Sequence, residues 1–525
     1  MSDLSLRKIV IVGGGTAGWM AAAPLAQLFA GSQVGRGCTE VVLVESPDIG
    51  TIGVGEATLP PIRAYNRSLG IDADDFIRHT QGSFKLGIEF CDWGRVGHRF
   101  FHGFGDFGPA IDNRSAWQHW LRLQRTVDNL PPYEDWSVAT VMARANRFSP
   151  PEGDTPAAAN AFSFAYHFDA GLYAAYLRDY ALARGARRIE GLIVDVERRP
   201  EDGFVAALKL QDGRRIDGDL FIDCSGFRAL LIGEAMASPF EDWSALLPCN
   251  SALAVPSERV TPLTPYTRST AQAAGWQWRI PLQHRTGNGH VYCNGFISDE
   301  AAADTLLAGL DGKALDTPRQ LRFTTGRRKA GWVKNVVAIG LSGGFLEPLE
   351  STSIQLIMDG VGRLIQFLPD RRCAPHLAAE FNRLMAQQYE TTRDFIALHY
   401  KLTQRRDTEL WRYCAAMPIP DTLAHQIELF RTTGRVAIYD RDGFAEPSWV
   451  SLFFGLGLRP EAYDPLVDRV DEAALVQHFA RVRQAIQQTV AGMPDHGDYI
   501  ARYVEAPRPH PGQGAARPAA GVSHH

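Results

Sequence analysis

The sequence predicts an α/β protein with a Rossmann-like unit at its start, a β-rich insertion and a mostly helical end. Three observations support this prediction. Near the start, an apolar run is followed by a glycine-rich turn and an alanine-rich segment. The middle of the chain has strand-like alternation between turns, and residues 376–490 have mostly helical periodicity. A chain of 525 residues is long enough for several such units.

The composition is that of a globular protein. Hydrophobic residues make up 45% of the chain and charged residues 22%, which excludes the disordered and fibrous classes. The formal net charge of −5 argues against non-specific nucleic-acid binding. The seven cysteines are scattered and none are spaced as CxxC, which indicates a reducing compartment and no structural zinc site. There is no long apolar stretch and no signal-peptide pattern, so we expect a cytoplasmic protein without membrane contact or bound metal.

A nucleotide site is predicted where the first strand ends. After the apolar run of residues 9–12, the turn fits the pattern G-x-G-x-x-G with Gly13, Gly14, Gly15, Thr16, Ala17 and Gly18. Such glycines let a pyrophosphate approach a helix N-terminus, where free N–H groups and the helix dipole favour anions. Glu45 ends the second strand and is a candidate acceptor for a ribose hydroxyl, although it lies further from the glycines than is usual. A tight turn without a ligand is the alternative.

A second match to the same pattern, Gly103 to Gly108, receives a different interpretation. Pro109 follows it and aromatic residues flank it. We expect neither a strand before it nor a helix directly after it, so we predict a loop near a pocket.

The chain is predicted to form one interrupted domain followed by helices. A segment at 218–226 and a late strand at 336–340 favour FAD over NAD, because two-domain flavoproteins need a return strand that closes around the flavin. The predicted units are a core at 1–375 that includes a β-rich insertion at about 190–335, a helical substrate-covering subdomain at 376–505, and a Pro/Gly/Ala-rich disordered tail at 506–525.

Over about residues 8–400 the motifs resemble those of the flavin-dependent tryptophan halogenases. The amino-terminal GGGTAGW is shared with many flavoproteins, whereas GWQWRIP at 275–281 and LEPLEST at 346–352 are far more restrictive. Further similar segments are VGEAT at 54–58, the Lys85 segment at 82–90, 165–178 and 219–228. The resemblance implies a Rossmann-like FAD-binding domain of the two-component flavin monooxygenase type, with a β-sheet insertion and a helical C-terminal substrate subdomain.

The resemblance also implies a reaction. Reduced FAD and dioxygen would oxidise chloride or bromide to hypohalous acid, which would travel through a tunnel to Lys85 and halogenate an indole-type aromatic ring. Lys85 would either hydrogen-bond the hypohalous acid or become a haloamine, and Glu350 would polarise the electrophile and help to remove the ring proton. A separate NAD(P)H-dependent flavin reductase would supply FADH2, and a homodimer is a further expectation.

Both reactive residues also make chemical sense by themselves. An ammonium in a partly apolar pocket is easier to deprotonate, and a neighbouring carboxylate can take or return that proton. Each residue has an ordinary alternative. Lys85 is a solvated surface lysine in that alternative, and Glu350 is a capping acid at the start of the helix after Pro348.

The other site residues are assigned by their match to the family's motifs. Trp276 and Trp278 are two residues apart on a predicted strand and hence on one face, where they would keep the substrate away from the flavin. Packing in a core or a loop is the alternative for the aromatic residues. The implied contacts are Glu56, Ala57, Val196, Leu341 and Ile354 with FAD; Thr352 and Ser353 with the halide through backbone N–H groups; and His102, Phe104, Trp276 and Trp278 with the substrate. Ser353 stands where the family usually has glycine, which leaves the preference between chloride and bromide open.

Three functions remain open from the sequence: a halogenase, an FAD-dependent aromatic hydroxylase, and a flavin-binding protein without catalysis. Lys85 and Glu350 favour the first. Residues 435–458 contain a single tryptophan, Trp449. They do not clearly reproduce the region that binds the amino acid backbone of free tryptophan in the family. We therefore expect an indole-type substrate without strict specificity for the free amino acid.

Overall fold

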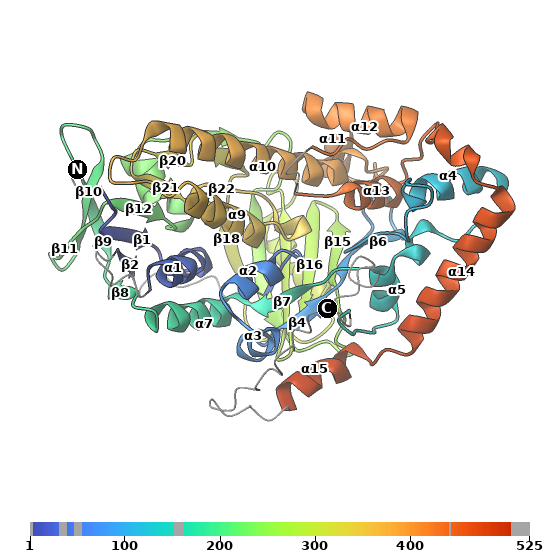
Figure 1. Cartoon of the computed structure of the whole chain (residues 1–525), viewed down its shortest axis with the longest axis horizontal. Coiled ribbons are helices and arrows are strands. Elements are labelled where there is room, and N and C mark those ends of the chain that lie inside the picture. Colours follow the sequence, from blue (N-terminus) through green and yellow to red (C-terminus); the bar gives the residue numbers. More distant parts are fainter. Residues whose placement is uncertain (1–3, 31–38, 47–54, 152–161, 440–442, 506–525) are drawn as a thin grey trace, which may run out of the picture.

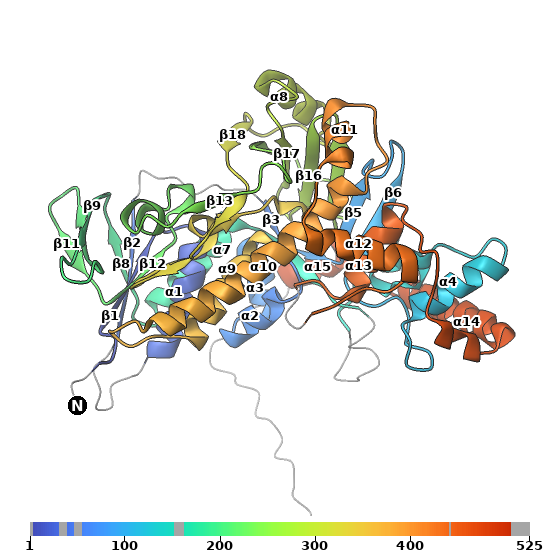
Figure 2. The same ribbon diagram turned by 90° about the horizontal axis from the view of Figure 1, so that it is seen from above.

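A computed structural model describes residues 4–30, 39–46, 55–151, 162–439 and 443–505. It has the mixed α/β architecture that the sequence predicts. One end holds a Rossmann-like sheet, the middle holds the largest sheet, and the last helices lie at the other end and along one side (Figures 1 and 2). The predicted tail at 506–525 lies outside the described residues.

The Rossmann-like sheet has six strands in the order β20-β21-β12-β1-β2-β8. All neighbours are parallel except β20 and β21. The strands are β1 (Lys8–Val12), β2 (Glu40–Glu45), β8 (Arg187–Glu190), β12 (Leu220–Asp223), β20 (Trp332–Val333) and β21 (Val336–Ala338). The late strand thus returns to the first sheet, beside β12, as the sequence predicts.

The apolar runs of β1 and β2 explain why this sheet forms. Ile9 and Ile11 belong to the main core, whereas Val10 and Val12 belong to a second core on the opposite face. All four side chains are buried, so β1 is covered on both faces, as is usual for parallel strands. Burying each such side chain contributes roughly 1.5–3 kcal/mol. On the main-core side, α1 (Thr16–Phe29) contacts α7 (Ala170–Leu182) and α9 (Ser353–Gln366).

Three small sheets of three strands each surround the large ones. The first is a meander of β9 (Ile193–Arg198), β10 (Val205–Leu210) and β11 (Arg215–Asp217). The second contains β13 (Phe240–Asp242), β19 (Gly326–Arg328) and β22 (Gly344–Phe345). The third places β7 (Ala165–Asp169) between β3 (Gly55–Ala57) and β4 (Ser83–Lys85), and so brings Lys85 into the interior.

The largest sheet has seven strands in the order β18-β14-β17-β16-β15-β5-β6. They are β5 (Gly87–Cys91), β6 (Arg99–Gly103), β14 (Ser251–Ser257), β15 (Thr267–Gln272), β16 (Gly275–Pro281), β17 (Thr286–Tyr292) and β18 (Arg319–Arg322). The sheet therefore extends beyond the predicted insertion at about 190–335, because β5 and β6 precede that segment. The structure also corrects the prediction for Gly103 to Gly108: β6 does precede this turn, but the next helix begins only at Ala116.

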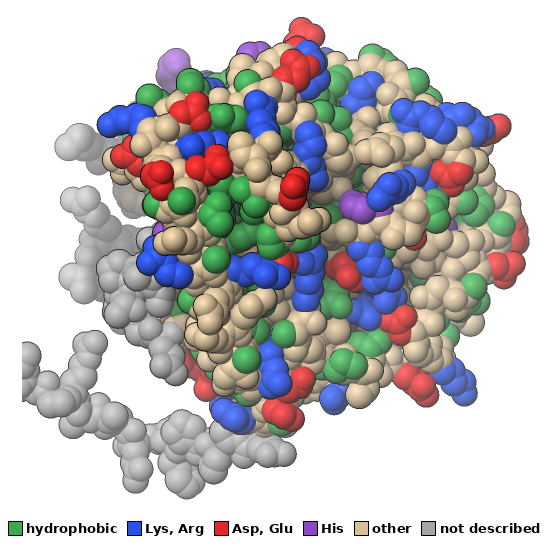
Figure 3. Space-filling view, turned by 90° about the vertical axis from the view of Figure 1, so that its right-hand side faces the viewer, with side chains coloured by type: hydrophobic (Ala, Val, Ile, Leu, Met, Phe, Trp, Pro, Cys, Tyr) green, Lys and Arg blue, Asp and Glu red, His purple; other side chains and the backbone are tan. Residues whose placement is uncertain are grey.

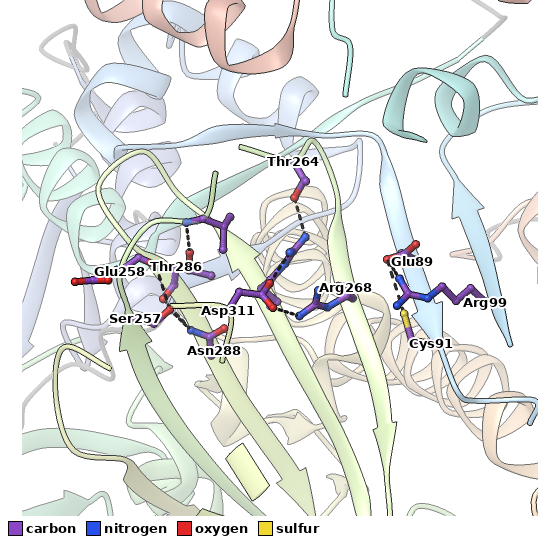
Figure 4. A network of polar contacts seen from close by, with 12 residues as sticks. Glu89, Cys91, Arg99, Ser257, Glu258, Thr264, Arg268, Thr286, Asn288 and Asp311 are labelled. Atoms are coloured by element: carbon purple, nitrogen blue, oxygen red, sulfur yellow. Dashed lines mark hydrogen bonds and ion pairs between the residues drawn. The ribbon is translucent and has the colours of Figure 1, made fainter. Parts of the chain in front are cut away.

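Polar side chains fix the face of β16 that points away from the two tryptophans. Arg279 donates to Asp311 (2.7 Å) and to Thr264 Oγ1 (2.9 Å), and Arg268 of β15 donates to the other oxygen of Asp311 (2.9 Å). Thr264, Arg268 and Asp311 are labelled in Figure 4. Because side chains alternate along a strand, these bonds direct Trp276 and Trp278 to the opposite face.

Every described element from residue 375 onward is a helix. The longer ones are α10 (Pro375–Lys401), α11 (Glu409–Ala416), α12 (Asp421–Thr433), α13 (Glu446–Gly455), α14 (Glu472–Ala491) and α15 (His496–Glu505). Earlier helices are α2 (Ile62–Ser68), α3 (Ala73–Thr80), α4 (Ala116–Thr126), α5 (Val138–Arg144) and α8 (Asp299–Ala308). On the face at the right of Figure 1, acidic and basic side chains are interspersed (Figure 3). In the described part of the chain, no helix is both long and apolar enough to span a membrane.

Candidate functional site

A cavity of about 430 Å³ is lined by residues of the Rossmann-like sheet and by Ser351, which contacts Lys85. Residues predicted to bind the cofactor line it: Gly13, Gly14, Gly15, Thr16, Ala17, Glu45, Glu56, Ala57, Leu341 and Ile354. Trp276, Trp278 and Ser353 also line it. Residues from distant parts of the sequence thus share one space.

The glycine turn fits a dinucleotide phosphate. The N-terminus of α1 has no side-chain cap, so its first N–H groups are available to an anion. A Cβ on Gly15 would meet no atom within 4 Å, whereas one on Gly13, whose φ is +109°, would overlap the Cys224 carbonyl oxygen. Gly15 therefore leaves space for a ligand, and Gly13 is required by the fold itself.

Two predicted cofactor residues lie outside the cavity, and a third lines it in spite of its unusual spacing. Gly18 does not line the cavity; it packs against the Gly13 carbonyl and lets α1 approach the turn. Val196 lies in β9 outside the cavity, and Ile193, three residues earlier, lines it instead. Glu45 does line the cavity despite its long spacing from the glycines, and its carboxylate also pairs with Arg188.

The glycine turn gives a direct test of cofactor binding. We expect Gly15→Val to weaken flavin binding at least about tenfold, because its side chain would occupy the space of the phosphates. Its φ of −74° suits valine, so thermal stability should stay near that of the unmodified protein. Flavin fluorescence titration and thermal unfolding measure the two effects. Gly13→Ala is the contrasting variant and should lose stability. Unchanged flavin affinity in Gly15→Val would contradict this role.

Lys85 is fully buried, which excludes the surface-lysine alternative. Its Nζ donates to the Thr58 carbonyl oxygen (3.0 Å) and to Ser351 Oγ (2.8 Å), and lies 5.1 Å from the centre of the Phe104 ring. Burial lowers the pKa of Lys85 to about 7, although the charge of Glu350 opposes this shift. The two acceptors match the two N–H groups of a neutral amine, whose lone pair is then free to react.

Glu350 is also fully buried and lies between two histidines. His102 Nδ1 is 3.0 Å from one carboxylate oxygen, and His399 Nε2 is 2.9 Å from the other. Burial would raise the pKa of Glu350, but the charges and hydrogen bonds of His102 and His399 outweigh it and hold the pKa at about 2. The N-terminus of α9 has no side-chain cap, so Glu350 does not have the predicted capping role.

His399 holds Glu350 from α10. Its Nδ1 faces the Phe395 carbonyl oxygen at 3.0 Å, and its Nε2 faces Glu350 Oε1 at 2.9 Å. Both ring nitrogens therefore have an oxygen partner, which fixes the orientation of the ring beside the carboxylate.

Two of the predicted substrate residues, His102 and Phe104, lie beside Glu350 and Lys85. His102 uses Nδ1 to bind Glu350, a contact that the stacking prediction did not include. Its ring also meets Phe104 (6.3 Å) and Phe395 (5.9 Å), and Phe395 in turn packs on Phe444 and edge-on against Trp449. Sequence reasoning missed Ser351, which lies inside the LEPLEST motif, and His399, for which the helical pattern of α10 gives no signal.

The start of α9 offers an anion site. Thr352 and Ser353 are its N-cap and first residue, and no side chain caps the helix. Thr352 Oγ1 is buried without a hydrogen-bond partner among the described residues. Free N–H groups at a helix start and an unpaired hydroxyl are suited to a halide. The structure thus puts the predicted halide residues next to Ser351 and Lys85.

The titration of Lys85 can be measured directly. We expect its amine to titrate near pH 7, so that about half of the molecules carry a neutral Lys85 there, against roughly one in a few thousand for an ordinary lysine. Lowering the pH should protonate it. The ¹³Cε signal of lysine in NMR spectra reports this change, and Lys85→Met identifies the signal by its loss. A midpoint above pH 9 would contradict the shift.

The comparisons with known proteins agree with this geometry. The family model for tryptophan halogenases matches residues 8–472. The chain belongs to the tryptophan halogenase family. It is an enzyme, a flavin-dependent halogenase, and the family implies FAD and a halide as co-substrate. The uncapped N-terminus of α1 and the cavity fit FAD, and the start of α9 fits the halide.

Several individual relatives are similar to this halogenase over nearly its whole length. BrvH, a flavin-dependent halogenase from Brevundimonas sp. BAL3, is 46% identical with a TM-score of 0.91, over 95% of this chain and 100% of that chain. Xcc4156 from Xanthomonas campestris, also a flavin-dependent halogenase, is 45% identical with a TM-score of 0.90, over 96% and 100%. Tryptophan 7-halogenase KtzQ from Kutzneria sp. (strain 744) is 34% identical, over 96% and 99%.

Proposed function

We propose that this halogenase uses FADH2, dioxygen and chloride or bromide to halogenate an indole-type aromatic ring through Lys85. The observation that carries the proposal is the position of Lys85: its buried amine contacts Ser351, which lines the cavity that fits the flavin. When bound, the reduced flavin supplies the chemistry that turns dioxygen and halide into hypohalous acid. The remaining steps belong to residues of this chain.

Lys85 holds the electrophilic halogen beside the substrate. A neutral amine can be converted to a haloamine, with loss of water from the hypohalous acid, whereas an ammonium can only hydrogen-bond the acid. The lowered pKa of Lys85 makes the neutral form available near pH 7. The Thr58 carbonyl oxygen and Ser351 Oγ orient the amine by accepting hydrogen bonds from its N–H groups. Substitution then breaks the bond to the halogen and forms a carbon–halogen bond on the ring.

Glu350 assists this substitution by its charge. A ring that has accepted the halogen is cationic, and its proton is acidic enough to leave to a weak base. An ionised carboxylate with a low pKa stabilises that cation and accepts the proton. His102 and His399 hold the carboxylate in place during the reaction.

The surroundings of His102 support an aromatic substrate. Phe104, Phe395, Phe444 and Trp449 surround this side of the site with aromatic side chains, a setting typical of the binding of an electron-rich ring. The two relatives at 45–46% identity are described as flavin-dependent halogenases, whereas those at 34% are described as tryptophan halogenases. We therefore propose indole-type compounds rather than free tryptophan alone, and a separate flavin reductase as partner.

Mass spectrometry tests the proposed function. Indole and free tryptophan are incubated separately with the protein, FAD, a flavin reductase, NADH and an equal mixture of chloride and bromide. A halogen isotope pattern on indole supports the proposal, and the two halogens report the preference. A pattern on tryptophan alone would overturn the substrate class. Hydroxylated product would overturn the reaction and favour an aromatic hydroxylase.

A further inference from the structure

A second buried glutamate, Glu347, lies three residues before Glu350 and has no part in the steps above. It follows β22, and its side chain is fully buried. Its neighbours in the chain, Leu346 and Pro348, both line the flavin cavity. Glu347 therefore sits directly behind the cavity wall.

Only one of the two carboxylate oxygens of Glu347 has hydrogen-bond partners among the described residues. The Trp276 indole N–H donates to Oε2 at 2.8 Å, and the Tyr400 hydroxyl donates to the same oxygen at 2.6 Å. Oε1 has no partner among the described residues. A buried carboxylate with one bare oxygen is costly. A neutral carboxylic acid suits this arrangement better, because its carbonyl oxygen still accepts both bonds and no unpaired charge is left in the core.

The groups around Glu347 favour the neutral form. Burial raises its pKa to about 7 against the effect of the two hydrogen bonds. The thiols of Cys249, Cys293 and Cys414 are its other titratable neighbours. Among the described groups that influence the pKa of Glu347, none is a cation. Glu350 differs because His102 and His399 both contact its carboxylate and lower its pKa.

Trp276 connects Glu347 to the cavity. The indole ring lines the cavity and has a single N–H donor, which is used on Glu347. The ring packs near Trp278 (centroids 6.1 Å apart) and Trp93 (6.4 Å). Such apolar contacts fix the rotation of the Trp276 ring less precisely than a directed hydrogen bond does. The bond to Glu347 is the polar contact that sets the ring's orientation.

We propose that Glu347 is a positioning residue: as a neutral acid it fixes Trp276 in the cavity wall and so keeps hypohalous acid on its way to Lys85. The first half of this proposal concerns the carboxyl group and the ring alone. The second half rests on the proposed function, because it requires that hypohalous acid is made in the cavity.

Infrared spectroscopy tests the neutral acid without any turnover. The C=O stretching band of a protonated carboxyl group is recorded at pH 6 for the unmodified protein and for Glu347→Gln, with FAD bound in both. We expect the difference spectrum to contain one such band, assigned to Glu347. Its absence would overturn the neutral form. Other acids with a raised pKa, such as Glu56, are present in both proteins and cancel.

Leakage of hypohalous acid tests the positioning role. A water-soluble 1,3-diketone captures escaped acid, and its halogenation is compared with that of indole. We expect Glu347→Leu to raise the ratio of captured to productive halogen at least about fivefold. Glu347→Gln keeps an acceptor oxygen for Trp276 and should restore a ratio within about twofold of the unmodified protein. An unchanged ratio in Glu347→Leu, or an equally raised one in Glu347→Gln, would overturn the role.

Two further variants separate positioning from loss of packing. In a Trp276→Phe background, which lacks the N–H donor, Glu347→Leu should add no further leakage. Tyr400→Phe removes the other donor and should leave the ratio near that of the unmodified protein. Additive leakage in the double variant would overturn the proposed connection. The two variants also keep the role testable if Glu347→Leu alone folds poorly. If the unmodified protein halogenates neither indole nor the diketone, the proposed function has failed, while the infrared result still decides the state of Glu347.

Discussion

Lys85→Ala is expected to lower halogenation of indole by about 10³-fold or more while FAD still binds. The amine is the group that holds the halogen, and a positioned acid–base or nucleophilic group commonly contributes 10²–10⁴-fold. The flavin cavity is lined by other residues, so the affinity for FAD should change little. Product is measured by mass spectrometry with isotope-labelled standards, and FAD affinity by fluorescence titration.

Two other variants at this position act as controls. Lys85→Met keeps most of the buried volume and should behave like alanine, which excludes a cavity effect. Lys85→Arg keeps the charge but cannot be deprotonated near neutral pH. It should retain partial activity if hydrogen bonding to hypohalous acid is sufficient, and none if a haloamine is required. Product formation by Lys85→Ala at a tenth or more of the normal rate would refute its role.

The sequence predicted the parts of this site that lie in continuous motifs. The strand, glycine turn and helix around Gly13 follow from local physical rules, because β-branched runs form buried strands and glycines permit the turn. The late strand at 336 was predicted from the same pattern. Lys85 and Glu350 were found through motif resemblance, since neither residue type is informative alone.

The rest depends on contacts between distant segments. His399 lies in a neighbouring helix and is 49 residues from Glu350 in the sequence. Its place in the 3.6-residue pattern of that helix is that of any buried helical residue. Val196 lies outside the cavity because the cavity follows the start of β9, where Ile193 lines it, and not its middle. The extent of the largest sheet was also missed, since β5 pairs with β15 across a separation that local alternation does not encode.

Glu350→Gln should slow halogenation by about 10²-fold with little effect on FAD affinity. The amide keeps the shape of the carboxylate but removes its charge, so the cationic ring loses its stabilising partner and its proton acceptor. The substitution also removes the carboxylate that His102 and His399 contact, and leaving a buried polar group without its partner costs roughly 1–3 kcal/mol. Thermal unfolding measured alongside activity separates the two effects.

A spectroscopic readout distinguishes a chemical role for Glu350 from a merely structural one. The negative charge of Glu350 raises the pKa of Lys85 against the effect of burial. Removing that charge should therefore move the Lys85 midpoint below pH 7, whereas Glu350→Asp, which keeps the charge, should leave it closer to 7. The same ¹³Cε signal reports both variants. If Glu350→Gln changes neither the rate nor this midpoint, the carboxylate does not act on the reacting amine, and the catalytic assignment falls.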